Sequence, residues 1–284
     1  MTILVTGARG SIGSEVVRAL RAGGHEVRGS ARDASMLDLP DAVSLDLTAE
    51  SGFEDALEGI DAIFLYPTAR AGAGHFLAAA KKSGVSYVVL LSSPDVREGA
   101  AGNPLRQAHL PSERAVRESG LPFTVVYPGW LAGNTRRDWG AAIRAGDPVR
   151  LFSPDAQFAP TAEADVAAVA ATLLAERSYP GSDLALTGPE SMTQRAVVAV
   201  LVEELGRSIE VRPETRGEAL ARRPEWMPAA VLEYLMDAEE AAEKRIAPVN
   251  NTVERFTGRP ATSFREWART HRSDFEKAAT VHIG

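Results

Sequence analysis

The first thirteen residues constrain the fold more than any other part of the chain. An apolar run ends at Thr6, glycines follow at Gly7, Gly10 and Gly13, and residues 14–20 have a helical pattern. A buried strand that turns tightly into a helix leaves the first N–H groups of the helix unpaired, which creates a site for an anion such as a dinucleotide pyrophosphate. One glycine permits the turn, one lets the backbone approach the phosphate, and one lets the helix pack against its strand. The alternative is a glycine-rich strand-to-helix turn that binds nothing.

Strand-like and helix-like segments alternate through the first half of the chain. Further strands are expected over residues 25–30, 42–46, 61–66, 85–91, 123–127 and 184–187, with helices over 53–59, 74–82 and 106–119. Nearly continuous Val, Ile and Leu strands separated by helices indicate a parallel sheet that is covered on both faces. The predicted fold is therefore α/β, a Rossmann-like doubly wound parallel sheet with ligands at the carboxyl ends of its strands.

The second half of the chain is less regular and predicts a smaller lobe. Glu163 and Asp165 are expected to cap an alanine-rich helix, helical patterns dominate from Met192, and a short strand is possible over 209–212. The acidic stretch 237–243 is interpreted as a solvated helix face. We expect a dinucleotide-binding domain of residues 1–128 plus about 163–187. We expect a mixed, mainly helical substrate lobe formed by residues of about 129–162 together with 188–284.

Composition narrows the class of protein. The 284 residues are 45% hydrophobic and 24% charged, which is ordinary for a soluble globular chain. No apolar run is long enough to span a bilayer, and Met1 leads directly into the first strand, so we expect a cytoplasmic protein without a signal peptide or membrane contact. The absence of cysteine and the scattered histidines predict no disulfide and no metal site. A net charge of −7 argues against nucleic-acid binding.

Several segments, taken in order, carry a resemblance to a known family. The opening motif, residues 6–13, resembles that of short-chain dehydrogenase/reductase relatives with a G-x-x-G-x-x-G fingerprint. Later segments resemble the atypical NmrA-like branch of that family, namely Leu91-Ser-Ser93, Glu113, 119–129, Asn134, 165–169 and 186–190. The resemblance covers most of the chain and is more specific for the fold than for the substrate.

The resemblance implies a dinucleotide held along the carboxyl ends of the strands. The expected cofactor-binding residues are Gly7, Arg9, Gly10, Ser11, Ile12, Gly13, Arg32, Asp46, Leu47, Tyr66, Pro67, Ser92, Tyr127, Pro128 and Gly129. NADP(H) is favoured over NAD(H), because Arg9 and Arg32 lie where a guanidinium can hold the 2′-phosphate. The alternatives are that both arginines are ordinary surface residues, with Asp33 on a ribose, and that Asp46 only caps a helix.

The proton donor usual in carbonyl-reducing members of the family is missing. Those members carry Tyr-x-x-x-Lys, in which the lysine lowers the pKa of the tyrosine. The corresponding positions here are Leu105 and His109, and residues 109–113 resemble the H-L-x-x-E stretch of NmrA-like quinone reductases and triphenylmethane reductase. His109 is the catalytic candidate, as a proton donor or shuttle. Alternatively, it only hydrogen-bonds the cofactor ribose or its neighbours.

Aromatic residues are enriched in the expected substrate lobe, where they fit a planar aromatic ligand or form the core of the lobe. The candidate substrate-binding residues are Ser93, Trp130, Trp139, Phe152 and Phe158. The leading hypothesis is NAD(P)H-dependent reduction of a quinone or polycyclic aromatic ketone by a monomer or homodimer, with O2-dependent ring hydroxylation in aromatic natural-product biosynthesis as a variant. The alternative is a non-catalytic, dinucleotide-binding redox sensor. An epimerase or dehydratase is disfavoured because that chemistry needs the missing tyrosine.

Overall fold

A computed structural model describes residues 1–66 and 73–276 and divides the chain into two compact units. The first unit comprises Met1–Gly129, Glu163–Leu186 and Asn250–Ala261. The second comprises Trp130–Ala162, Thr187–Val249 and Thr262–Gly284.

The first unit is built on a seven-stranded sheet in which every pairing is parallel. The strand order is β3-β2-β1-β4-β5-β6-β9. The bounds are β1 (Thr2–Val5), β2 (Glu26–Ala31), β3 (Ala42–Ser44), β4 (Ala62–Leu65), β5 (Tyr87–Leu91), β6 (Phe123–Pro128) and β9 (Ser182–Leu186). The order reverses between β1 and β4, which creates the crevice where doubly wound sheets bind ligands. The predicted Rossmann-like fold is confirmed.

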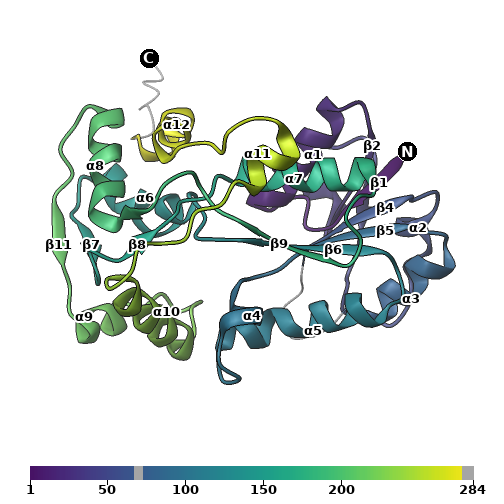
Figure 1. Ribbon diagram of the computed structural model, residues 1–284, viewed down its shortest axis with the longest axis horizontal. Coiled ribbons are helices and arrows are strands. Elements are labelled where there is room, and N and C mark those ends of the chain that lie inside the picture. Colours follow the sequence, from purple (N-terminus) through teal and green to yellow (C-terminus); the bar gives the residue numbers. More distant parts are fainter. Residues whose placement is uncertain (67–72, 277–284) are drawn as a thin grey trace, which may run out of the picture. The chain divides into compact units, whose positions relative to one another are not determined.

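Helices cover both faces of this sheet (Figure 1). One face carries α1 (Ser11–Ala22), α7 (Glu163–Glu176) and α11 (Thr252–Thr257), and the other carries α2 (Glu54–Leu57), α3 (Gly74–Lys82) and α5 (Pro104–Glu118). Two short elements, η1 (Ala34–Met36) and α4 (Asp95–Glu98), follow β2 and β5. Buried aliphatic residues of β4 and β5 fill the core, as expected for strands covered on both sides.

Several elements differ from their predicted bounds for local reasons. The third strand stops at Ser44 instead of reaching residue 46, because the Asp46 carboxylate accepts bonds from the Thr48 amide and hydroxyl and turns the chain. The helix expected over 53–59 is a single turn that ends before Gly59, whose φ is +69°. The helix expected to begin at residue 106 begins at Pro104, because Asn103 caps it with bonds from the amides of residues 105 and 106.

Residues 250–261 belong to the first unit, although the sequence analysis assigned them to the smaller lobe. The guanidinium of Arg259 lies 2.8 Å from the carboxylate of Asp165, which is buried in the first turn of α7. The side-chain amide of Asn250 donates to the Ala185 carbonyl of β9, and Phe256 packs edge-on against Tyr179. These contacts join segments distant in sequence, so local pattern could not reveal them.

The second unit is mixed and mainly helical. Its helices are α6 (Asn134–Ala145), α8 (Gln194–Leu205), α9 (Arg216–Ala221), α10 (Ala229–Ala242), α12 (Phe264–Thr270) and η2 (Arg272–Phe275). Two small sheets pair β7 (Val149–Leu151) in parallel with β11 (Val211–Pro213), and β8 (Gln157–Phe158) antiparallel with β10 (Met192–Thr193). Its core includes Trp139, Leu201, Phe264 and Trp267. In either unit, none of the described helices has the length and apolar character that crossing a membrane requires.

Candidate functional site

The glycine turn between β1 and α1 has the geometry expected of an anion cradle. Gly7 has a φ of +64°, in the left-handed region, and its carbonyl accepts the Gly10 amide at 2.9 Å. Gly10 is the N-cap of α1, and no side chain caps the helix. The first N–H groups of α1, from Ser11 onward, therefore remain available for a ligand phosphate.

Gly13 is required by the close packing of the helix on the turn. A Cβ at Gly13 would lie 2.2 Å from the carbonyl oxygen of Gly7, a separation that real Cβ atoms essentially never show. Gly10 tolerates more, since a Cβ there would meet the same oxygen at 3.2 Å. The turn is thus a backbone cradle that side chains would fill, and the pyrophosphate of a dinucleotide fits its donor set.

Two arginines and two carboxylates lie where strands β1 to β3 end. Arg9 is close enough to help lower the pKa of Asp33, and Arg32 does the same for Asp46, although bonds to Ser35 and Thr48 lower those pKa values more. Both guanidinium groups are exposed, and within residues 1–66 and 73–276 neither makes a hydrogen bond or salt bridge. Two cations are therefore free to receive an anion at this end of the turn.

Strand β4 delivers an aromatic side chain onto the glycine turn. The Tyr66 amide donates to the Thr6 hydroxyl, and the Tyr66 side chain packs where a Cβ on Gly7 would lie, with 41% of the residue exposed. Pro67, also expected to contact the cofactor, lies outside the described residues. Leu47 is buried in the core of the first unit, so only its backbone could reach a ligand.

The serine pair after β5 divides into two roles. The Ser93 hydroxyl donates to the Asp95 carboxylate at 2.6 Å and accepts the Asp95 amide, so it is already used in starting α4. Ser92 is buried, and its Oγ has no hydrogen-bond partner in the described part of the chain. A buried hydroxyl without a partner costs free energy, which makes Ser92 the member of the pair with capacity for a ligand.

His109 lies on α5, one turn after the position that carries leucine instead of tyrosine. Its Nδ1 atom is buried and has no partner among the described residues. Burial lowers the pKa of His109, while the carboxylates of Asp95 and Glu113 act in the opposite direction. The imidazole is therefore mainly neutral at pH 7 and keeps an unused ring nitrogen.

A buried polar network that the sequence analysis did not find fixes α5 on the sheet. Glu113 is 3% exposed, and its carboxylate accepts from the Tyr127 hydroxyl and from Arg117, which also bonds Asp183 at 2.8 Å. Burial, followed by the bond to Glu113, raises the pKa of Tyr127. The Tyr127 side chain is thus part of the core, and only the backbone of Tyr127 and Pro128 could contact a cofactor. The Gly129 amide is already bonded to the Leu186 carbonyl.

The aromatic residues expected to bind substrate have unequal surroundings. Trp130 stacks on Phe158 with centroids 5.5 Å apart and lies 6.3 Å from Trp139. Trp139 is 7% exposed and belongs to the core of the second unit. Phe152 is half-buried, and Phe152 and Trp139 line a cavity of about 460 Å³ within the second unit.

The interpretation of residues 237–243 as a solvated helix face is wrong for part of the stretch, since Ala242 is buried and Ala238 and Glu239 are half-buried. Asp237, Glu240 and Glu243 are exposed, but Glu239 is half-buried and lines the same cavity. Glu239 follows Met236, which is buried, at helical spacing, so it lies on the inner face of α10. This periodicity was a signal that the sequence offered.

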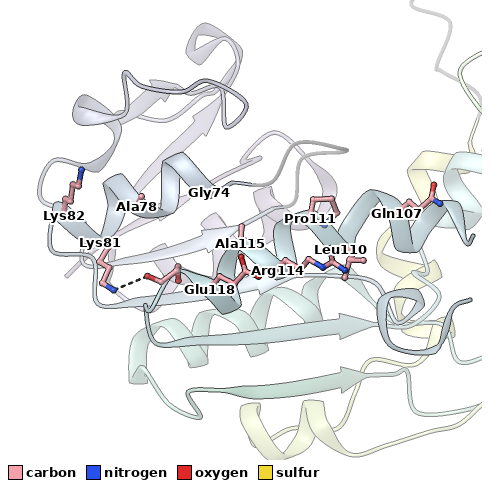
Figure 2. Close-up of a pocket in the computed structure, with 11 residues that line it drawn as sticks. Gly74, Ala78, Lys81, Lys82, Gln107, Leu110, Pro111, Arg114, Ala115 and Glu118 are labelled. Atoms are coloured by element: carbon pink, nitrogen blue, oxygen red, sulfur yellow. Dashed lines mark hydrogen bonds between the residues drawn. The ribbon is translucent and has the colours of Figure 1, made fainter. Parts of the chain in front are cut away.

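A second hollow, of about 980 Å³, runs between α3 and α5 (Figure 2). Its lining includes Ala78, Leu110 and Pro111, with Lys81 and Glu118 near the C-terminal ends of the two helices. These ends precede β5 and β6, so this hollow extends toward the amino-terminal edge of the sheet. It contains none of the predicted cofactor residues, so the glycine turn stays the candidate dinucleotide site.

Comparisons with known proteins agree with this geometry. Residues 7–177 match the model of a family described as NAD(P)H-binding. The chain is 35% identical to (4-alkanoyl-5-oxo-2,5-dihydrofuran-3-yl)methyl phosphate reductase of Streptomyces griseus, over 96% of this chain and 99% of the relative. It is 28% identical to the NAD(P)H azoreductase of Xenophilus azovorans, over 97% and 100%. The structure of an NADPH-dependent quinone oxidoreductase from Escherichia coli superposes with a TM-score of 0.78 at 23% identity, covering 96% and 100%.

The family match spans the glycine turn, strands β2 to β6, and α7. It confirms that the turn belongs to a dinucleotide-binding protein, as the resemblance implied. The chain belongs to the NAD(P)H-binding family and is an NAD(P)-dependent oxidoreductase of the NmrA-like atypical short-chain dehydrogenase/reductase type.

Proposed function

We propose that this protein uses NADPH to reduce a quinone or a polycyclic aromatic ketone, a flat and conjugated electrophile. The observation that carries the proposal is Leu105, a leucine at the position of the family's tyrosine, because it leaves no phenol to protonate an isolated alcohol oxygen. A conjugated acceptor spreads the charge that arrives with a hydride over its ring, and its protons can come from solvent.

The names of the relatives support this class of acceptor. An unsaturated furanone, an azo group and a quinone share a polarised, conjugated double bond. Each is reduced when a hydride adds to one atom of the conjugated system and a proton adds to another. The common requirement is a positioned planar acceptor, and a dedicated acidic side chain is dispensable.

The residues of the first unit have assignable parts in this reaction. When bound, the nicotinamide supplies the hydride. The N-terminus of α1 and the backbone of Gly7 and Gly10 would hold the pyrophosphate, and Arg9 and Arg32 would hold the 2′-phosphate that distinguishes NADPH from NADH. The two neighbouring carboxylates, Asp33 and Asp46, already accept local bonds, so they compete weakly for these guanidinium groups.

His109 is assigned to the acceptor oxygen. A neutral imidazole can donate one N–H hydrogen bond, which stabilises the negative charge that develops on an oxygen as the hydride arrives. The unpartnered, buried Nδ1 supports this role, since a ligand would supply its missing partner. The proton that the reduced acceptor takes up comes from solvent, and the neutral imidazole keeps its own N–H.

The test monitors NADPH absorbance while quinones and polycyclic aromatic ketones are offered, with oxygen present and excluded. Turnover in both conditions supports reduction. Product that contains an added oxygen atom only in air supports the variant in which the electron-rich hydroquinone reacts with O2 and the ring is hydroxylated. Tight NADPH binding without turnover in either condition contradicts the proposal and favours the redox sensor.

A further inference from the structure

The cavity of about 460 Å³ within the second unit has the size of a small-molecule site. It is enclosed by α6, the segment around β7, and helices α9 and α10. Its lining combines apolar side chains with polar and charged ones. None of the predicted cofactor residues lines this cavity. Its lining residues lie at 137–152, within the family match, and at 194–239, beyond that match.

The apolar part of the cavity lining suits a flat ring. It contains Phe152, Met227, Leu232 and Leu235, together with Trp226 at the rim. Trp226 is 66% exposed, an unusual position for so large an apolar side chain. A planar ligand that covered the indole would remove apolar surface from water, and each Å² buried favours binding by about 25 cal/mol of free energy.

The polar part of the cavity lining includes Glu239. Its carboxylate accepts bonds from the buried side chain of Gln194 and from the Ser153 amide. Removal from water, together with the nearby carboxylates of Asp138 and Glu214, raises the pKa of Glu239 to about 7. Glu239 is therefore protonated to a large extent at neutral pH, and its hydroxyl can donate a hydrogen bond.

The other charges that line the cavity do not neutralise Glu239. Arg137 forms two bonds to Asp138, at 2.7 and 2.8 Å, and Arg222 pairs with Glu214 at 2.5 Å. Arg223 donates to the carbonyls of residues 224 and 227, while Asp147 and the exposed Arg150 complete the charged lining. Glu239 has no salt bridge within the described parts of the chain. A carboxyl group that is about half protonated at neutral pH thus lines the same cavity as the aromatic side chains.

We propose that this cavity binds the planar, carbonyl-bearing ring of the acceptor, with the protonated carboxyl of Glu239 donating a hydrogen bond to a ring carbonyl oxygen. The inference rests on the proposed function for the identity of the ligand. It assigns recognition of that ligand to Glu239, Phe152 and Trp226. Ligand binding here requires no cofactor, because all the groups involved belong to the second unit.

Isothermal titration of the full-length protein with menadione, a naphthoquinone, tests this in the absence of NADPH. The chain has no cysteine, so thiol addition to the quinone cannot imitate binding. Because only the protonated carboxyl donates, affinity should be highest below the pKa of Glu239 and should fall by about tenfold between about pH 6 and about pH 8.5. Glu239→Gln has a neutral donor at every pH, so its affinity should be nearly independent of pH.

Glu233→Gln is the matched control, because Glu233 lies on the same helix and is exposed. It should keep the pH dependence of the unmodified protein. Trp226→Ala supplies a variant at an exposed position, where loss of folding is not expected, and it should weaken binding by about fivefold. Absence of menadione binding, a pH-independent affinity of the unmodified protein, or an unchanged pH dependence in Glu239→Gln would each overturn the proposal.

The same titrations separate this inference from the proposed function. Menadione binding with the expected pH dependence but without NADPH oxidation would refute the reductase proposal and leave the cavity as a ligand site. Conversely, NADPH-dependent turnover with unchanged binding in Glu239→Gln and Trp226→Ala would place the acceptor elsewhere and overturn the inference alone.

Discussion

Gly13→Ala should disrupt the packing of α1 on the glycine turn and weaken dinucleotide binding. The new Cβ would begin 2.2 Å from the Gly7 carbonyl oxygen, so that oxygen must move by at least 0.8 Å to reach the 3.0 Å limit of real contacts. The same oxygen accepts the Gly10 amide, a bond worth about 0.5–1.5 kcal/mol. Overpacking adds about 1–3 kcal/mol, and the better helix propensity of alanine returns about 1 kcal/mol. We expect a net loss of about 2 kcal/mol in stability, within a range of about 0.5–3.5 kcal/mol.

NADPH binding should weaken as well, because the displaced turn is the surface that we propose to hold the pyrophosphate. A loss of about 1.4 kcal/mol in binding raises the NADPH dissociation constant about tenfold. Calorimetric titration measures this constant, and urea unfolding followed by circular dichroism measures stability. Gly217→Ala on α9 is the control, because a Cβ there meets nothing within 4 Å and should leave NADPH binding unchanged. Unchanged affinity and unchanged unfolding in Gly13→Ala would refute the packing argument.

Three further predictions concern charged and titratable groups. Arg9→Ala and Arg32→Ala should each raise the dissociation constant of NADPH by about tenfold and that of NADH by less than about twofold; equal losses for the two cofactors would contradict a 2′-phosphate contact. His109→Gln should lower kcat more than it changes the NADPH dissociation constant. Burial lowers the pKa of His109 below its ordinary value of 6.5, so on acidification the unfolded chain binds this proton before the folded chain does. The stability of the unmodified protein should therefore fall as the pH drops below about 6.5. Melting temperatures measured across this pH range should fall less in His109→Gln. Arg117→Met should lower the free energy of unfolding by about 2 kcal/mol, because it removes the cation that faces buried Glu113. This value is already reduced to allow for the partial exposure of the arginine. Thermal unfolding tests the prediction, and an unchanged Tm would contradict it.

The sequence predicted the features of the fold that depend on short stretches of chain. The glycine turn, the apolar strands and the helix that begins near residue 104 each follow from neighbouring residues, and the structure has them within a few positions. The pairing of Arg259 with Asp165 joins residues almost a hundred positions apart, so no local pattern contains it. Segment 250–261 was therefore assigned to the wrong unit.

The candidate site shows the same difference between features set by neighbouring residues and features set by distant segments. Gly7 and His109 stood out because a motif and an altered motif mark their positions. The burial of Glu113 and Glu239 was not predicted, although Glu113 belongs to the H-L-x-x-E stretch, because a buried carboxylate looks like any surface acid until its surroundings are known. Glu113 is held by Tyr127 and Arg117, while Glu239 lies in a cavity, and both surroundings are made by distant segments.

The division of the chain between the two units has an evolutionary consequence. The chain passes between them five times, because the second unit consists of a segment after β6, another after β9, and the C-terminal segment. Neither unit is one uninterrupted stretch of chain. Under the proposal that the second unit binds the acceptor, acceptor preference would change through point substitutions or the exchange of individual insertions. The strands that carry the glycine turn lie outside those insertions. New acceptors can accordingly be acquired while the hydride-supplying half of the molecule stays under separate selection.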